Sequence, residues 1–309
     1  MNRFALFALF TLAAYAPAAD PAKKVLLVGI DGCRPDAIAA SQAKHLPARI
    51  AAGTYSDRCD VPGDRAKNAD TASGPGWATI LTGVWADRHG VVDNEVKKHT
   101  LKDCPHLFAR VKTARPKAET AAFVTWPPLH DPLLAGADGV RLVLDGDKKG
   151  YKEGDKQVAD EAVKYLGDAD PEVVFVYFGH VDSTGHGYGF HPKAPKYTNA
   201  IEEADAHLGR ILEAIEKRPT RKREDWLVVV TTDHGGKGRG HFPGAKEPEI
   251  RTGFLVVSGA SAKKEVLKTK TGTVDVVPTV LTHLGVPIEA DWKLDGTCVG
   301  LDEGAKREK

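Results

Sequence analysis

The chain has 309 residues, of which 42% are hydrophobic and 28% are charged, a composition that supports a substantial buried core and argues against a disordered chain. Its 43 lysines and arginines nearly balance its 42 aspartates and glutamates. This balance provides no overall field that would attract nucleic acid or an anionic membrane, so no nucleic-acid-binding surface is predicted.

The first 18 residues have the order of a secretory signal peptide. Arg3 precedes an apolar run over residues 4–14, and small residues follow at 16–18. This order favours a signal peptide over a buried N-terminal helix or strand, and the run is too short to span a bilayer. We therefore expect one domain, residues 19–309, that is exported to the periplasm or secreted, with no membrane span after cleavage.

Export would permit disulfide bonds. The mature part contains four cysteines, whose spacing matches no zinc-finger pattern: Cys33, Cys59, Cys104 and Cys298. Four cysteines allow three full pairings, among which the sequence does not choose. One or two bridges and buried thiols are both compatible with the pattern.

Short runs rich in valine, isoleucine and phenylalanine alternate with helical patterns along the chain. The runs predict strands over residues 25–30, 120–125, 140–144, 173–178, 226–231 and 254–257. Apolar spacing predicts helices over residues 198–218 and 273–286, the second closed by Gly285. Apolar strands separated by helices are typical of an α/β fold with a mainly parallel central sheet and helices on both faces. Polar loops, with a predicted role in substrate contacts, fall at residues 59–72, 144–156 and 183–199.

Three of the predicted strands lead into an aspartate: Asp31, Asp182 and Asp233. The carboxyl ends of parallel strands share one edge of a sheet, where ligands bind. Any one of these aspartates could cap a helix. Three at one edge indicate a shared ligand instead.

Histidines accompany two of these aspartates. His186 follows Asp182 by four residues. His234 comes directly after Asp233, and His241 lies just beyond. Carboxylate and imidazole ligands together suit Zn²⁺ and similar first-row metals, whereas Ca²⁺ and Mg²⁺ sites consist almost wholly of oxygen. Three histidines in glycine-rich turns beside carboxylates therefore predict metal binding rather than structural histidines.

Ser73 lies in the stretch TASGPGW, directly before a predicted helix whose first turn suits Pro75. At that position a serine most often caps the helix, but the helix N-terminus also favours an anion. Together with three aspartates and three histidines, Ser73 completes the seven ligands that two metals sharing a phosphate would need. Coordination lowers the pKa of a hydroxyl, so Ser73 is interpreted as a nucleophile, with Thr71 as the second candidate.

The motifs IDGCRPD, SGPGWATILTGVWADRHGVVDN, VDSTGHGYGF and TTDHGG, followed by a later histidine, closely resemble the alkaline phosphatase superfamily. Within it, they are similar to the nucleotide pyrophosphatase/phosphodiesterase branch. The resemblance covers nearly the whole mature chain, to VDVVPTVLTHLGV and LDGT. It implies an alkaline-phosphatase-like fold and a hydrolase of phosphodiester or pyrophosphate substrates, nucleotides in type, that forms a covalent phosphoserine.

By position, the resemblance implies two divalent metal ions, usually zinc. One would be held by Asp31, Ser73, Asp233 and His234, and the other by Asp182, His186 and His241. Ser73 stands where the branch commonly has threonine, which keeps the chemistry of the nucleophile. The branch's phosphate-binding asparagine, taken to follow the proline, corresponds to Gly76. A side-chain donor is therefore expected to be missing unless the Gly76 N–H or another residue replaces it.

Basic and aromatic residues near these motifs are candidates for substrate contacts. Arg34 and Arg239 are predicted to contact substrate, with Lys237 as a further cation and a salt-bridged side chain as the alternative for Arg34. Aromatic residues that would stack on a base, or belong to the core, are Trp77, Trp126 and Tyr188. Two divalent ions opposite three aspartates and an ionised serine leave the site close to neutral, which favours a diester monoanion over a monoester dianion.

Other activities use the same kind of site. A phosphomonoesterase or phosphonate hydrolase is the main alternative within the enzymes. A sulfatase is disfavoured because the pattern Cys/Ser-x-Pro-x-Arg ends in Trp77 here. A non-catalytic metal-binding protein is disfavoured because Ser73 is present. The small-molecule phosphate ester, the metal and the oligomeric state are not predicted further.

Overall fold

The computed structural model describes residues 20–62, 65, 69, 71–97, 99–137 and 139–301. The predicted signal peptide, residues 1–18, lies outside these ranges. Among the helices of the described residues, none combines the length and the apolar character that a membrane span requires.

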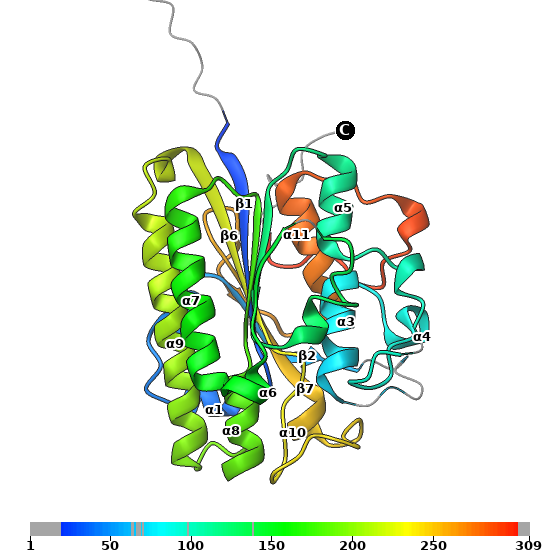
Figure 1. The fold of residues 1–309 in the computed structure, drawn as a ribbon, viewed down its shortest axis with the longest axis vertical. Coiled ribbons are helices and arrows are strands. Elements are labelled where there is room, and N and C mark those ends of the chain that lie inside the picture. Colours follow the sequence, from blue (N-terminus) through cyan, green and yellow to red (C-terminus); the bar gives the residue numbers. More distant parts are fainter. Residues whose placement is uncertain are drawn as a thin grey trace, which may run out of the picture.

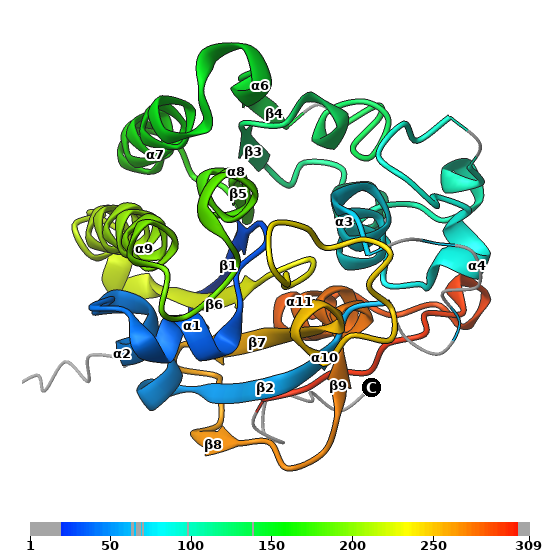
Figure 2. The ribbon, with the colours of Figure 1, turned by 90° about the horizontal axis from the view of Figure 1, so that it is seen from below.

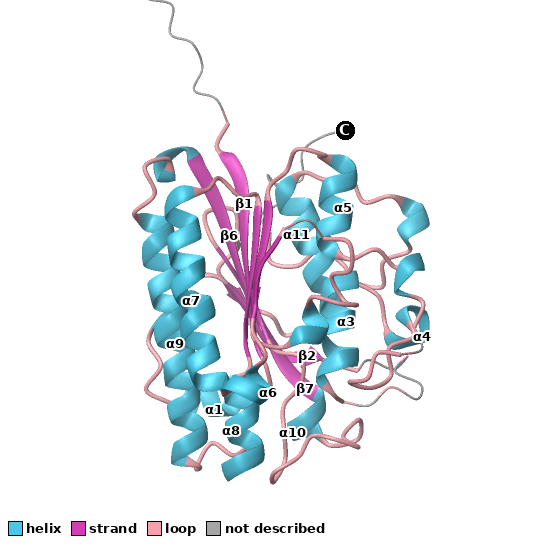
Figure 3. Ribbon diagram, viewed as in Figure 1, coloured by secondary structure: helices cyan, strands magenta, loops and turns pink. Residues whose placement is uncertain are grey.

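The described strands form a nine-stranded sheet in the middle of the protein (Figure 3). They are β1 (Ala22–Ile30), β2 (Thr54–Asp60), β3 (Thr120–Val124), β4 (Val140–Val143), β5 (Val173–Phe178), β6 (Glu224–Thr231), β7 (Thr252–Ser258), β8 (Glu265–Val266) and β9 (Thr271–Gly272). Their order is β4-β3-β5-β1-β6-β7-β2-β8, and β9 also pairs with β2. Only β7 runs antiparallel to its neighbours β6 and β2 in this described sheet, which confirms the mainly parallel prediction.

All six predicted strands are present with small shifts at their ends, and β2 and the two-residue strands β8 and β9 were missed. The central strands β5 and β6 are buried at every residue, which explains why their apolar runs could be predicted as strands from the sequence. The β2 sequence TYSDRCD is polar instead. Asp57 and Arg58 are exposed where the pairing of β2 with β7 shifts register, so periodicity gives no signal there.

Helices cover both faces of the sheet (Figure 1). One face carries α1 (Pro35–Ala40), α7 (Tyr151–Asp168) and α9 (Pro195–Glu216), and the other carries α3 (Ser73–Thr82), α5 (Leu107–Ala114) and α11 (Val276–Leu284). Each face has its own core, because alternate residues of β1 point to opposite sides: Val25 and Leu27 join one core, Leu26 and Val28 the other. The remaining helices are α2 (His45–Ala52), α4 (Ala86–His89), α6 (Gly146–Lys149), α8 (His180–Tyr188) and α10 (Pro248–Arg251). Single 3₁₀ turns are η1 (Leu101–Asp103), η2 (Pro127–Leu129), η3 (Arg221–Arg223), η4 (Thr273–Asp275) and η5 (Ala290–Trp292).

The helices predicted over residues 198–218 and 273–286 are confirmed, as is the helix predicted after Ser73, which is α3, and two predicted loops are wrong. The helix over 198–218 is α9, and the segment 273–286 forms η4 and α11, closed by Gly285 at a φ of 69°. The loop predicted at 144–156 contains α6 and the start of α7, whose first turn is polar because its outer side is exposed. The loop predicted at 183–199 overlaps α8, a helix with little apolar surface to reveal it.

The cysteines favour one of the two alternatives left by the sequence. Cys33, Cys59 and Cys104 are buried thiols. Burial raises the pKa of the Cys33 and Cys59 thiols far above the ordinary range, so both behave as small apolar core residues. Cys298 is half-buried and packs against the core on the side of α3 and α11.

The carboxyl ends of β1, β5 and β6 share one edge of the sheet because the three strands run in parallel. This edge is at the bottom of Figure 1, and Figure 2 looks onto it. Helices α8 and α10 lie at the same edge. The fold thus brings chain segments far apart in sequence to one place, as the predicted strand ends required.

Candidate active site

Two of the predicted aspartates lie side by side at the ends of neighbouring strands. Asp31 directly follows β1, and Asp233 follows β6 after one intervening residue. The Gly32 N–H donates to Asp233 Oδ1 at 3.2 Å and so links the two turns. Gly32 has a φ of 65°, and a Cβ there would lie 2.7 Å from Asp182 Oδ1. Glycine is therefore required for the close approach of this turn to the third aspartate.

Asp182 comes from a helix rather than from a strand end. It lies in the first turn of α8, and His186 lies one turn later on the same face. The buried carboxylate of Asp155 fixes the start of α8 by accepting hydrogen bonds from the N–H groups of Gly179 and His180, at 3.0 and 2.8 Å. The prediction that Asp182 follows directly at the end of a strand is therefore wrong. Asp182 lies instead on the short helix α8, whose N-terminus is capped by Asp155.

The described acids and imidazoles form two candidate metal clusters, within each of which one ligand atom per residue lies within 4.8 Å of the others. We call Asp31, Asp233 and His234 the inner cluster, and Asp182, His186 and His241 the outer cluster. In the inner cluster, His234 Nε2 lies 3.3 Å from Asp31 Oδ1 and 3.4 Å from Asp233 Oδ2. In the outer cluster, His186 Nε2 lies 3.4 Å from Asp182 Oδ2 and 3.1 Å from His241 Nε2.

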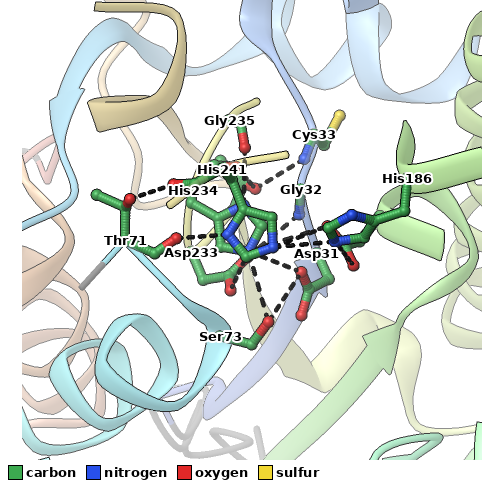
Figure 4. Close-up of polar contacts among 12 residues, drawn as sticks. Asp31, Gly32, Cys33, Thr71, Ser73, His186, Asp233, His234, Gly235 and His241 are labelled. Carbon is green, nitrogen blue, oxygen red and sulfur yellow. Dashed lines mark hydrogen bonds and ion pairs between the residues drawn. The ribbon is translucent and has the colours of Figure 1, made fainter. Parts of the chain in front are cut away.

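The two clusters adjoin each other, as Figure 4 shows. His234 Nε2 lies 4.0 Å from Asp182 Oδ1, and the His234 and His241 rings stack with centroids 3.8 Å apart. Six of the seven ligands predicted from the sequence, the aspartates and the histidines, are therefore brought together, in the two sets that the resemblance implied.

Ser73 belongs to the same group of side chains. It is the first residue of α3, and its Oγ lies 3.4 Å from both Asp31 Oδ1 and His234 Nε2. The N-cap residue of α3 is Ala72, which makes no side-chain capping bond, and the Gly74 N–H in the first turn donates to Asn94 Oδ1 rather than to Ser73. The capping interpretation of Ser73 is therefore not supported, and its hydroxyl points at the inner cluster (Figure 4).

Thr71 holds His241 rather than taking the place of Ser73. Its hydroxyl donates to the His241 carbonyl oxygen, and its own carbonyl lies 2.6 Å from His241 Nδ1. The second bond places the proton of the imidazole on Nδ1 and leaves Nε2 as an acceptor toward the outer cluster.

Backbone carbonyls orient the other two imidazoles in the same way. His234 Nδ1 lies 2.8 Å from the Gly235 carbonyl oxygen, and His186 Nδ1 lies 2.9 Å from that of Arg239. Each Nδ1–H donates to its carbonyl, so each Nε2 carries a lone pair toward the carboxylates. All three histidines are thus in the tautomer that ligates a metal through Nε2.

Two aromatic donors fix the Asp31 carboxylate. Trp77 Nε1 donates to Asp31 Oδ2 at 2.9 Å, and the Tyr177 hydroxyl donates to the same oxygen at 2.6 Å. Oδ1 is therefore the oxygen that faces Ser73 and His234. From the sequence, Trp77 was predicted only as a core or stacking residue, and Tyr177 was given no role. Both residues lie in apolar stretches of the sequence, and only the folded structure shows that their polar atoms reach Asp31.

The buried carboxylates of Asp182 and Asp233 lack positively charged partners that would stabilise their ionised form. The pKa values of Asp182 and Asp233 are raised well above the usual range, first by burial and then by the neighbouring Asp31. Asp182 Oδ1 and Asp233 Oδ2 are buried without a hydrogen-bond donor. Burial, followed by His234, lowers the pKa of His241 to about 2, so its imidazole is neutral. Unmatched carboxylate oxygens beside the neutral His241 imidazole fit divalent cations, which would supply the missing charge.

The predicted basic substrate contacts are not found at the site. Arg34 donates through Nε and Nη2 to Asp36, and through Nη1 to the carbonyls of Phe190 and Gly236. Its guanidinium therefore ties β1 to the loop after β6, which corrects the substrate-contact prediction in favour of the salt bridge. Arg239 is exposed and reaches the cluster only through its carbonyl oxygen.

Gly76 does not replace a side-chain donor either. Its N–H donates within the first turn of α3, to the Ala72 carbonyl, and a Cβ there would lie 2.8 Å from Asp233 Cβ. The sequence missed Asn94 instead, whose Oδ1 accepts from the Gly74 N–H at 2.7 Å and whose side chain lines the same cavity as Ser73. The signal was the final residue of the motif HGVVDN.

A cavity of about 280 Å³ opens onto Ser73 and the outer cluster. It is lined by Ser73, Asn94, Trp126, Asp147, Tyr151, Tyr177, Gly179, Asp182, Ser183, His186, His241 and Phe242. A larger hollow of about 460 Å³ lies over β2 and contains none of the cluster residues. The smaller cavity is therefore the candidate substrate site.

Comparison with known proteins agrees with this geometry. A family model described as type I phosphodiesterase / nucleotide pyrophosphatase matches residues 25–238. Human ectonucleotide pyrophosphatase/phosphodiesterase family member 7 is 26% identical over 180 residues, which are 53% of this chain and 38% of the relative. The chain thus matches well under half the length of this relative.

Solved structures show the same fold. Murine ectonucleotide pyrophosphatase/phosphodiesterase 5 superposes with a TM-score of 0.62 and 16% identity, covering 86% of this chain and 96% of the other. A 2-O GAG sulfatase superposes with a TM-score of 0.69 and 14% identity, covering 91% of this chain and 73% of the other. The alkaline-phosphatase-like α/β fold predicted from the sequence is confirmed.

Proposed function

Because this chain belongs to the type I phosphodiesterase/nucleotide pyrophosphatase family, we propose that it hydrolyses phosphodiester or pyrophosphate substrates, nucleotides among them, through a phosphoserine on Ser73. One observation carries the proposal: the Ser73 hydroxyl lies 3.4 Å from a ligand of the inner cluster on each side and opens into the cavity that the outer cluster also lines. A serine so placed is within reach of a phosphorus atom held between the clusters.

The proposal includes two divalent metal ions, most simply zinc. The unmatched oxygens of Asp182 and Asp233 and the Nε2 atoms of the three histidines suit such ions. When bound, the ions would lower the pKa of the Ser73 hydroxyl and neutralise charge on the phosphate. Asp31, Asp233, His234 and Ser73 would hold one ion, and the outer cluster would hold the other.

The chain's own residues account for the orientation of the reaction. Ser73 attacks phosphorus and forms the phosphoserine while the alcohol or nucleotide leaves, and water then cleaves the phosphoserine. Asn94 lies beside the nucleophile, where its amide suits a non-bridging phosphate oxygen. Trp77 and Tyr177 keep the Asp31 carboxylate turned toward Ser73 throughout.

The charges of the cavity support a diester in preference to a monoester. A monoester dianion gains from a fixed cation on its second negative oxygen. No lysine or arginine is among the described residues that line the cavity. Arg34 is paired with Asp36, and Lys237 is paired with Glu247. A diester monoanion needs no such partner.

The nucleophile is tested by trapping. Wild-type protein loaded with Zn²⁺, mixed with bis-p-nitrophenyl phosphate and quenched in acid, should yield a peptide phosphorylated at Ser73 by mass spectrometry. Ser73→Ala should lower kcat by about 10³-fold or more while keeping the fold and most of the bound metal. A phosphopeptide at Thr71, or full activity in Ser73→Ala, would contradict the proposal.

The substrate class is tested by a panel with one leaving group. We expect kcat/KM to be higher for bis-p-nitrophenyl phosphate than for p-nitrophenyl phosphate, with a dinucleotide polyphosphate as a further substrate. A higher value for the monoester, or for a p-nitrophenyl phosphonate ester, would move the protein to the phosphomonoesterase or phosphonate hydrolase alternative. Turnover of a sulfate ester alone, or metal binding without turnover, would support the remaining alternatives.

We also propose that the protein is exported, on the order of charged, apolar and small residues over positions 1–18. Fractionation of expressing bacterial cells, with N-terminal sequencing of the exported form, tests this. Cleavage after Ala18 is the expected result, and an intact chain confined to the cytoplasm would contradict it.

A further inference from the structure

A cavity outside the catalytic site is lined mainly by basic side chains. It is the hollow of about 460 Å³ over β2, which is larger than the cavity at Ser73 and contains none of the cluster residues. Three segments of the chain supply its lining residues, which are Arg58, Cys59, Asp60, Arg251, Thr252, Lys268 and Lys270. We call this cavity the basic hollow.

The pairing of β2 explains why these three segments meet. Asp60, the last residue of β2, pairs with the start of β7 on one side and with β9 on the other. The pairing of β2 with β8 ends before its pairing with β9 begins, which leaves residues 56–58 of β2 between the two. Residues 267–270 connect β8 to β9 and carry two lysines to the hollow. Figure 2 shows α10 and β9 beside this end of β2.

Asp60 holds two of the cations in the hollow. Its carboxylate, only 9% exposed, accepts from Arg251 Nε and Nη2 at 3.2 and 2.9 Å, and from Lys270 Nζ at 2.7 Å. One carboxylate is thus shared between two cations and neutralises only one of their charges. These contacts fix the position of both cations before any ligand binds, which lowers the entropic cost of binding.

The other two cations extend from exposed positions. Arg58 lies 3.9 Å from the exposed Asp57, an ion pair of the kind that contributes little. Lys268 is exposed and has no ion-pair partner among the residues that the structure describes. When Asp57 and Asp60 are both counted, the described side chains at the basic hollow keep an excess of two positive charges.

The basic hollow and the cavity at Ser73 are therefore suited to different ligands. The described lining of the cavity at Ser73 contains carboxylates and imidazoles but no lysine or arginine. The basic hollow offers guanidinium and ammonium groups, which bind phosphate and sulfate groups through charge-assisted hydrogen bonds. Its volume leaves room for more than one such group, and its cations come from separate segments around one opening.

We propose that the basic hollow is a binding site for a multivalent oxyanion, a small molecule that carries two or more phosphate or sulfate ester groups. Neither Ser73 nor a cluster residue lines the hollow, so the site does not depend on the proposed activity. If such anions bind at the hollow but no phosphate ester is hydrolysed, the site stands and the proposed activity fails.

The test is a calorimetric titration of the zinc-loaded protein at low ionic strength. Glucose 1,6-bisphosphate and a glucose disulfate are the multivalent probes, and glucose 1-phosphate is the probe with one group. We expect the bisphosphate or the disulfate to bind at least about tenfold more tightly than glucose 1-phosphate, and the difference to shrink with added salt. The tighter of the two multivalent probes identifies the ester class of the natural ligand.

Two substitutions at exposed positions locate the binding. Arg58→Gln and Lys268→Gln each remove a charge without touching the Asp60 contacts, and each should weaken binding of the tighter probe about three- to tenfold. Any binding to metal ions at the two clusters is common to all these proteins and does not contribute to the difference.

Lys264→Gln is the matched control. Lys264 is an exposed lysine directly before β8 and is not among the residues that line the hollow. Its substitution makes the same change of charge nearby and should leave the affinity as in the wild type. Equal affinities for the probes with one and two groups would overturn the proposal. So would affinities that Arg58→Gln and Lys268→Gln leave unchanged, or that Lys264→Gln lowers as much as they do.

Discussion

The inner and outer clusters have similar ligands but very different surroundings. The inner side chains are closed off, with 1% of Asp31 and none of Asp233 and His234 exposed. In the outer cluster, 41% of the His186 side chain and 19% of Asp182 are exposed. Sheet ends build the first cluster, whereas a short helix and a loop build the second.

The difference shows that the two clusters of one site have different roles, because one is built on the sheet and the other on an accessible edge. The inner carboxylates are fixed by Trp77, Tyr177 and the Gly32 N–H, all in the sheet or directly against it. The outer His186 depends on the carbonyl of exposed Arg239. We therefore expect the inner cluster to hold its ion tightly beside the nucleophile, and the outer cluster to exchange its ion with solvent.

Removing one imidazole from each cluster should separate these roles most strongly. His234→Ala should lower kcat/KM on the order of 10³-fold, because it removes a fully buried ligand 3.4 Å from the Ser73 hydroxyl. His186→Ala should cost less, on the order of 10²-fold, because water can replace an exposed ligand. Kinetics at saturating Zn²⁺ and metal content after dialysis measure both effects.

His191→Ala is a suitable control, since His191 is an exposed imidazole that belongs to neither cluster. It should change neither activity nor metal content. Circular dichroism must show native helix content for each variant. An equal loss of activity and metal in His234→Ala and His186→Ala would show that the two clusters act as one unit and break the comparison.

The aromatic donors to Asp31 should have the next largest effect. Trp77→Phe or Tyr177→Phe removes one hydrogen bond to Oδ2 and lets the carboxylate turn, so we expect a loss on the order of 10- to 100-fold in kcat/KM or metal affinity. Tyr165→Phe is the control, because Tyr165 makes a similar bond to Glu119 at 2.7 Å outside the site. Retention of full activity in both site variants would mean that the inner cluster needs no support.

The sequence predicted the ligands better than the elements that hold them. Asp31 and Asp233 follow apolar strands that are buried on both faces, so periodicity placed them at one edge. Asp182 lies on α8, a helix fixed by the distant Asp155, which no local pattern reveals. Asn94 was missed for the same reason, because its contact with Gly74 spans 20 residues.

The raised pKa values of the buried cluster carboxylates should appear in the pH dependence of stability. In metal-free protein the raised pKa values of Asp182 and Asp233 mean that the folded state binds protons that the unfolded state has released above about pH 4. The free energy of unfolding should therefore fall as pH rises through this window, by up to about 1.4 kcal/mol per unit for each group. Urea titrations at several pH values measure it.

Two variants sharpen the comparison in the same experiment. Asp233→Asn should flatten the pH dependence more than Asp182→Asn, because Asp233 is fully enclosed and Asp182 is 19% exposed. Asp168→Asn, at an exposed position on α7, should leave it unchanged. Saturating Zn²⁺ should reverse the slope, since bound carboxylates are ionised and stability is then lost as pH falls. If neither Asp233→Asn nor Asp182→Asn changes the pH dependence of the free energy of unfolding, other groups are responsible for it.

Thr71→Val should have the smallest effect, and it tests whether the outer cluster tolerates loss of a support. The substitution removes the hydroxyl bond to the His241 carbonyl but keeps the backbone carbonyl that accepts from His241 Nδ1. The imidazole keeps its tautomer and loses one of two restraints. One hydrogen bond contributes about 1 kcal/mol, so kcat/KM should fall about fivefold.

Thr113→Val, which removes an exposed hydroxyl bond to the Ala109 carbonyl within α5, should leave kcat/KM unchanged. A loss of about 10³-fold in Thr71→Val, in a folded protein with its metal, would instead mark Thr71 as the nucleophile. Ser73 would then be only a ligand, and the nucleophile would lie beside the outer cluster instead of the inner one.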